Sequence, residues 1–224
     1  SGVVGRVGSA VEQLKAFGSS NAITAWLDAP DPSVNFNRAH DAHHAGTGQW
    51  FFETDQFLQW RREENSFLWL HGMSGCGKTV LSSTIVRRLT EDGAAPVLFF
   101  YFDFSDARKQ QFEAMIRSFL VQIYYKAASA QASIRLLYDS HSQGCIQPDL
   151  ELLEDTLRSI LSHLKHVDII IDALDESQTL DRILQWCKKT HDCRTTSLRL
   201  LVTSRTQVVQ WPKKDQLFSI QSAE

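Results

Sequence analysis

This chain of 224 residues is poor in several features that would mark whole classes of protein. Its longest apolar run, residues 96–102, has the length of a strand, whereas a membrane-spanning helix needs about 18 residues. Only four cysteines occur, without a pattern, which favours a reducing, cytoplasmic setting over a disulfide scaffold. The formal net charge is -3, so there is no basic footprint. We therefore expect neither a membrane span nor a nucleic-acid partner.

From residue 66 onward the sequence alternates between strand and helix patterns. Short apolar runs occupy residues 67–70, 97–102, 167–171, 198–203 and 217–220, and apolar residues at helical spacing fall within 78–89, 112–123, 150–164 and 180–187. Ser105 or Asp106 is the expected cap of the second helix. Strands that are apolar throughout and alternate with helices predict an α/β fold with a parallel sheet covered on both faces.

The first 65 residues differ from this pattern and are predicted to form a helical lead-in to the core at 66–224. One or two short helices are expected within residues 9–28, and a proline-containing loop at 29–33. A polar stretch, residues 35–49, precedes an aromatic segment, residues 50–60, that suggests a helix lying on the core.

One segment between the first strand and the first helix carries a phosphate-binding pattern, G-x-x-x-x-G-K-[ST]. Its glycines allow successive backbone amides to turn inward, and the following helix adds its N-terminal dipole. A chance match in a chain this long is on the order of 1%, and the strand-helix context lowers that further. The predicted nucleotide-binding residues are Gly72, Met73, Ser74, Gly75, Cys76, Gly77, Lys78, Thr79 and Val80. Lys78 supplies charge for the terminal phosphates, and Thr79 an oxygen ligand for Mg²⁺.

An acidic motif follows the apolar strand at 167–171. Asp172 stands at the strand's end, where an aspartate holds magnesium, as in a Walker B motif. Asp175 and Glu176 come next and are candidates for orienting or deprotonating a water molecule. The alternative is that these two acids only cap a helix beginning near Ser177.

Arg205 ends a further strand, within the string LLVTSR. Because the carboxyl ends of parallel strands share one edge of the sheet, Arg205 is predicted to reach the γ-phosphate. The alternative is a solvated surface arginine.

Together these motifs resemble the NACHT NTPases of the STAND class, the switch modules of NLR-type receptors. The resemblance covers roughly residues 24–210 and is carried by HGMSGCGKT, IIIDALDES and LLVTSR, with a fungal-type NFNRAHDAHHAGTGQWFFE upstream. It implies a P-loop sheet with strand order 5-1-4-3-2 and a chain that stops before the helical and winged-helix parts. Thr206 departs from the family, which often has proline there.

For function, the resemblance implies binding of ATP/ADP, with GTP/GDP possible, and Mg²⁺. It further implies slow hydrolysis and self-association in an open state, in signalling, innate-immunity or incompatibility responses. The upstream stretch containing Thr47 and Gly48 is expected to lie against the nucleotide base.

Two other functions remain open from the residues alone: a binding-only nucleotide module and a P-loop kinase. A Ras-type GTPase is disfavoured because no [NT]-K-x-D motif occurs. A metal site at His40, His43 and His44 is disfavoured because no carboxylate or cysteine stands beside them at metal-motif spacing.

Overall fold

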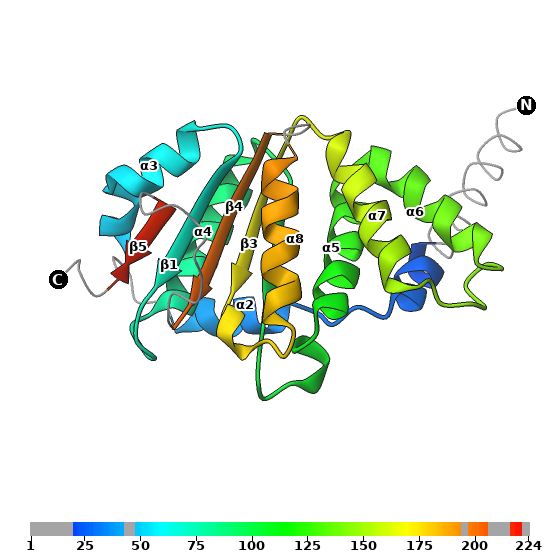
Figure 1. Ribbon diagram of the computed structural model, residues 1–224, viewed down its shortest axis with the longest axis horizontal. Helices are drawn as coiled ribbons and strands as arrows, with labels where there is room; N and C mark the ends of the chain where they lie inside the picture. The colour runs from blue at the N-terminus through cyan, green and yellow to red at the C-terminus, as the bar shows by residue number, and fades with distance from the viewer. Residues whose placement is uncertain (1–19, 43–47, 194–196, 206–215, 221–224) are drawn as a thin grey trace, which may run out of the picture.

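The computed structural model describes residues 20–42, 48–193, 197–205 and 216–220, and within them it contains one five-stranded sheet (Figure 1). The strand order is β2-β3-β4-β1-β5, and every pairing is parallel. From its other edge, this is the predicted order 5-1-4-3-2, which is confirmed. The strands are β1 (Ser66–His71), β2 (Val97–Tyr101), β3 (His166–Asp172), β4 (Ser197–Ser204) and β5 (Leu217–Ser219).

Helices cover both faces of the sheet. Neighbouring strand residues point to opposite faces, so Phe67 and Trp69 join one hydrophobic cluster while Leu68 and Leu70 join the other. The helices are α2 (Ser33–Asp41), α3 (Asp55–Arg62), α4 (Lys78–Asp92), α5 (Phe112–Lys126), α6 (Ala128–Ser140), α7 (Leu150–Ser162) and α8 (Leu180–Asp192), with 3-10 turns η1 (Gln49–Glu53), η2 (Ala107–Lys109) and η3 (Leu174–Glu176).

The described part of the lead-in packs into both clusters. Residues 20–27 are helical, and Ile23, Trp26 and Leu27 pack with the face covered by α5, α7 and α8. Phe51 and Trp60, from η1 and α3, pack with α4 on the opposite face. The helices expected before residue 20 lie outside the described residues.

Two helices were not predicted, and one predicted cap is wrong. The polar stretch after residue 33 forms α2, and α6 was not predicted. The long helix α5 begins at Phe112, beyond Ser105 and Asp106, so the predicted cap is wrong. Asp106 instead accepts a hydrogen bond from Arg108 N and caps the short turn η2. The Phe112 amide donates a 2.8 Å hydrogen bond to Thr179 Oγ1, so a distant loop caps α5.

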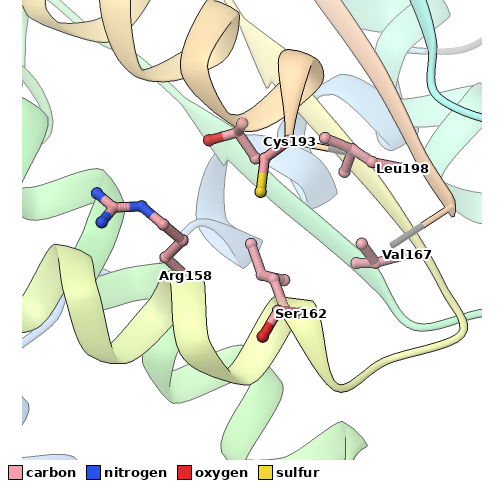
Figure 2. Close-up of a pocket in the computed structure, with 7 residues that line it drawn as sticks. Arg158, Ser162, Val167, Cys193 and Leu198 are labelled. Atoms are coloured by element: carbon pink, nitrogen blue, oxygen red, sulfur yellow. The ribbon is translucent and has the colours of Figure 1, made fainter. Parts of the chain in front are cut away.

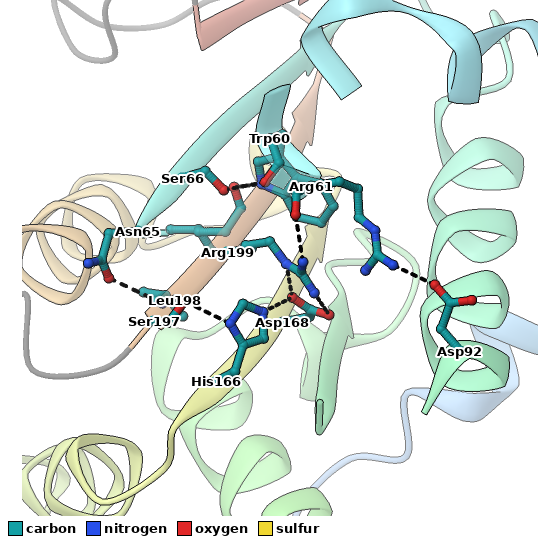
Figure 3. A network of polar contacts seen from close by, with 11 residues as sticks. Trp60, Arg61, Asn65, Ser66, Asp92, His166, Asp168, Ser197, Leu198 and Arg199 are labelled. Atoms are coloured by element: carbon teal, nitrogen blue, oxygen red, sulfur yellow. Dashed lines mark hydrogen bonds and ion pairs between the residues drawn. The ribbon is translucent and has the colours of Figure 1, made fainter. Parts of the chain in front are cut away.

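A buried ion pair joins β3 and β4 near their amino ends (Figure 3). Arg199 donates to both oxygens of Asp168, at 2.6 and 2.7 Å, and the two side chains are only 8% and 2% exposed. His166 contacts Ser197 Oγ at 2.7 Å and Asp168 at 3.2 Å. The early position of Asp168 in its strand therefore places it in a structural network at the end of the sheet opposite to Asp172.

Candidate functional site

The phosphate-binding pattern forms a loop between β1 and α4. Gly75 and Gly77 have φ angles of 81° and 89°, in the left-handed region that disfavours other residues. Gly77 is the residue before the first turn of α4, and no side chain caps that helix end. The amides of the first helical turn are therefore available to an anion.

Lys78 folds back over the loop that precedes it. Its Nζ donates hydrogen bonds of 2.6 Å to Gly72 O and 2.7 Å to Met73 O, and it lies 3.6 Å from Cys76 Sγ. The lysine is 9% exposed, so the loop holds a largely buried positive charge.

At the end of β3, the Asp172 carboxylate accepts hydrogen bonds from two hydroxyl groups. Thr79 donates to Oδ2 and Thr203 to Oδ1, each at 2.7 Å. Burial raises the pKa of Asp172, against the opposing hydrogen bonds from Thr203, Thr79 and Ser82 and the charge of Lys78. A carboxylate beside a hydroxyl is an oxygen set that suits Mg²⁺ bound together with a substrate phosphate.

Ala173 turns the chain sharply after Asp172. Its φ of 58° is left-handed, and its amide donates a 2.9 Å hydrogen bond to Thr203 Oγ1. This turn leads into η3, which carries both remaining acids. The alternative in which those acids cap a helix near Ser177 is wrong, because α8 begins at Leu180, after Thr179.

The two acids on η3 have different partners. Asp175 accepts a 2.9 Å hydrogen bond from the Arg205 amide and pairs with Arg205 Nε. Glu176 accepts a 3.1 Å hydrogen bond from the Phe104 amide. Burial raises the pKa of Glu176; the Phe104 hydrogen bond opposes this, and the charges of Asp175 and Asp103 add to it.

A cavity of about 270 Å³ brings most of the predicted site together. It is lined by Ser74, Gly75, Gly77, Lys78, Thr79, Val80, Ala173, Asp175, Glu176, Thr203 and Arg205. Asp172 does not line the cavity, but it accepts hydrogen bonds from Thr79 and Thr203, which do. Among the predicted residues of the phosphate-binding loop, Gly72, Met73 and Cys76 do not line this cavity.

A second, mainly apolar cavity of about 150 Å³ shares Gly77 and Val80 with the first. It is lined also by Ala42, Gly48, Trp50, Cys76, Leu81 and Ile220. Gly48 has a φ of 78°, and a Cβ there would lie 3.2 Å from Leu81 Cδ1, so the position favours glycine. The structure thus places Gly48 next to the loop, while Thr47, His43 and His44 lie outside the described residues.

Three contributors to the site were missed from the sequence. Thr203 holds Asp172 and Ala173, yet within LLVTSR only the arginine was given a role. The Phe104 amide comes from a segment without a recognisable motif, whereas Trp50 lies in the upstream stretch that carries the resemblance, where only Thr47 and Gly48 were given a role.

Other parts of the described chain offer weaker candidates. A cavity of about 20 Å³ lies between α7, α8 and the amino ends of β3 and β4. Figure 2 shows residues that line it, Arg158 and Cys193 among them. It lies away from the strand ends that form the site. In the described residues, no three His, Cys, Asp or Glu side chains gather as a metal-binding group. No described helix is long and apolar enough to cross a membrane.

Comparison with known proteins places these features in a family. The sequence pattern of the family described as Nephrocystin 3, N-terminal, matches residues 46–205. The chain is also 28% identical over 214 residues to the vegetative incompatibility protein HET-E-1 of Podospora anserina. That similarity covers 91% of this chain and 15% of the relative, so the chain corresponds to a small part of it.

Proposed function

Because the chain belongs to the Nephrocystin 3 N-terminal family and is a NACHT-type nucleotide-binding domain, we propose that it binds ATP or GTP with Mg²⁺ and hydrolyses it slowly. In the longer protein, this reaction would control self-association in a signalling response. One observation carries the proposal: the Thr79 hydroxyl and the Asp172 carboxylate meet at 2.7 Å beside the loop that holds Lys78.

The phosphates would occupy the cavity of about 270 Å³. There the amides of loop residues that line the cavity, such as Gly75, Gly77 and Lys78, would donate to them. Lys78 Nζ would exchange a loop carbonyl for a phosphate oxygen. Thr79 and Asp172 would hold Mg²⁺, which when bound neutralises charge on the phosphate oxygens.

The base would lie in the neighbouring apolar cavity. Its wall includes the partly exposed ring of Trp50, and Gly48 leaves it open where a side chain would meet Leu81. Thr47, directly before Gly48, completes the proposed base-contacting pair. The described lining of this cavity does not favour adenine over guanine, so ATP and GTP both remain candidates.

Among the site's acids, Glu176 is the stronger candidate for activating water. Its pKa is raised by burial, which makes its carboxylate a stronger base, and one hydrogen bond from Phe104 orients it. Asp175 has both oxygens engaged by Arg205. Arg205, on the cavity wall, would stabilise charge on the γ-phosphate.

A role in an incompatibility-type or immune response follows from a different observation. The printed name of the fungal relative describes a vegetative incompatibility protein. We propose that the present domain serves as the nucleotide switch of a protein with that kind of response, acting in the cytoplasm.

Single-turnover measurements separate this function from its two alternatives. Radiolabelled Mg-ATP or Mg-GTP is mixed with excess protein, and both bound and released products are followed over time. The proposal predicts tight binding followed by slow release of phosphate to water. Binding without product would indicate a binding-only module, and product that requires an added acceptor would indicate a kinase.

A further inference from the structure

Asp175 and Arg205 form a clamp at the rim of the phosphate cavity. One oxygen of the Asp175 carboxylate accepts a 2.9 Å hydrogen bond from the Arg205 backbone amide, and the other oxygen accepts one from Arg205 Nε. The Asp175 side chain is 14% exposed, whereas that of Arg205 is 54% exposed. The acid is therefore the more buried member of the pair, and the arginine is the more exposed member on the wall of the cavity.

The atoms used in this clamp determine what the arginine can still do. Nε and the backbone amide are occupied by Asp175, while the terminal nitrogens Nη1 and Nη2 have no hydrogen-bond partner among the described residues. A guanidinium held through Nε can still offer two donors to a phosphate oxygen. Arg205 and Lys78 line the same cavity, so both cations can face one terminal phosphate.

The turn at Ala173 fixes where the acid stands. Its left-handed backbone and its hydrogen bond to Thr203 join η3 to β4, the strand that leads to Arg205. The turn and η3 are thus held to the end of β4 at two points, by Ala173 at Thr203 and by Asp175 at Arg205, the residue after the strand. Glu176, one residue later, contacts the Phe104 amide and makes no hydrogen bond to the arginine.

We propose that Asp175 is a positioning residue that holds Arg205 in the orientation needed to distinguish a nucleoside triphosphate from a diphosphate. This inference rests on the proposed nucleotide function and assigns to Asp175 a role other than activation of water. Diphosphate, which lacks the terminal group, would not depend on the clamp.

The test compares Mg-ATP and Mg-ADP dissociation constants for wild type, Asp175→Asn, Arg205→Lys and the double variant, with Mg-GTP and Mg-GDP in parallel. Asparagine replaces one of the two acceptor oxygens by a donor NH₂ group, so one of the two contacts to Arg205 is lost. We expect Asp175→Asn to lower the preference for triphosphate by about fivefold or more, the effect of a weakened charge-assisted hydrogen bond. Arg205→Lys, which lacks the planar fork, should lower it similarly. The triphosphate preference of the double variant should be little lower than that of either single variant, because both changes act on one contact.

Asp155→Asn is the matched control. Asp155 also pairs with an arginine, Arg158, at 2.6 Å, but on α7 and outside the cavity. Its triphosphate preference should equal that of wild type. A folded Asp175→Asn protein whose preference for triphosphate is unchanged overturns the inference, whether or not its hydrolysis is slowed. If Asp175→Asn does not fold, an unchanged preference in Arg205→Lys overturns the inference instead. Wild type that binds no nucleotide instead removes the proposed function and this inference together.

Discussion

Thr79 donates a 2.7 Å hydrogen bond to Asp172 although the two residues are 93 positions apart in the chain. The contact joins the loop-helix segment after β1 to the end of β3. Thr203, at the end of β4, donates to the other oxygen of the same carboxylate. Helix α4 and strands β3 and β4 therefore meet at one buried acid.

Asp172→Asn should lose the part of nucleotide affinity that depends on magnesium. The amide keeps one acceptor for a threonine hydroxyl but removes the negative charge that Mg²⁺ prefers. In wild type, nucleotide affinity measured with Mg²⁺ should therefore exceed the affinity measured with a chelator. In the variant the two affinities should be nearly equal. Asp181→Asn, an exposed acid on α8, is the control and should retain the difference. If Asp172→Asn keeps the wild-type difference in affinity, Asp172 does not hold the magnesium ion.

Glu176→Gln should bind triphosphate about as well as wild type yet hydrolyse it at least ~100-fold more slowly, the lower range for a lost general base. Glutamine preserves the shape and can still accept the Phe104 amide. Single-turnover hydrolysis and equilibrium binding on the same preparation test the two halves of this prediction. Normal hydrolysis by this variant would show that Glu176 does not activate the water.

The pH dependence of hydrolysis gives an independent check on Glu176. A general base acts in its deprotonated form, so the rate should fall as the pH is lowered through the pKa of Glu176. That pKa lies above its ordinary value of 4.5, chiefly because of burial. In Glu176→Gln the fall in hydrolysis rate at low pH, which we assign to this group, should be absent. A fall that persists unchanged in the variant belongs to another residue.

Bound nucleotide should protect Cys76 from alkylation. This partly buried thiol lies in the phosphate-binding loop, 3.6 Å from Lys78 Nζ, and also lines the proposed base cavity. Mass spectrometry of each cysteine, with and without Mg-nucleotide, measures the protection. Cys145 is exposed and lies outside both cavities, so its labelling should not change. Equal labelling of Cys76 in both states would contradict the proposed position of the ligand.

Asp168→Asn should destabilise the fold by about 3–5 kcal/mol, because it leaves the buried charge of Arg199 without its partner. Asp155→Asn breaks an exposed ion pair with Arg158 and should cost less than about 1 kcal/mol. Denaturant unfolding near neutral pH measures both. A loss below 1 kcal/mol for Asp168→Asn would show that the buried pair adds little over a neutral hydrogen bond.

This ion pair also predicts how stability depends on pH. Burial alone would raise the pKa of Asp168, but hydrogen bonds from His166 and Arg199 and the arginine's charge hold it below the ordinary value of 3.8. A depressed folded pKa stabilises the protein above the unfolded pKa and loses that contribution as pH falls through the folded one. Wild type should therefore lose stability below about pH 4 more steeply than Asp168→Asn.

The sheet could be predicted because its strands are apolar on both faces and its loops carry recognisable motifs. The resemblance to NACHT domains, drawn from the same motifs, is confirmed by the family match. The helix α6 was missed because it buries only Ala130, Ile134 and Leu137 and has no capping side chain at its start.

Contacts between strands could not be predicted from local patterns. Asp168 and Arg199 meet because they are register partners in β3 and β4, 31 positions apart. The sequence near either residue carries no sign of the other. The same holds for Asp175 and Arg205, which were each predicted to lie in the site but not to bond to each other.

Titration of Mg-ATP and Mg-GTP into wild type and Lys78→Ala, followed by calorimetry, tests the central claim most directly. Lys78 supplies the only side-chain cation of the phosphate-binding loop, and its loss should abolish tight binding while circular dichroism remains that of the folded protein. Lys188→Ala removes an exposed lysine on α8 and should bind as wild type does. We expect saturable binding of one nucleotide per chain in wild type and none in Lys78→Ala. Wild-type affinity in a folded Lys78→Ala protein, or no binding in wild type, would contradict the claim.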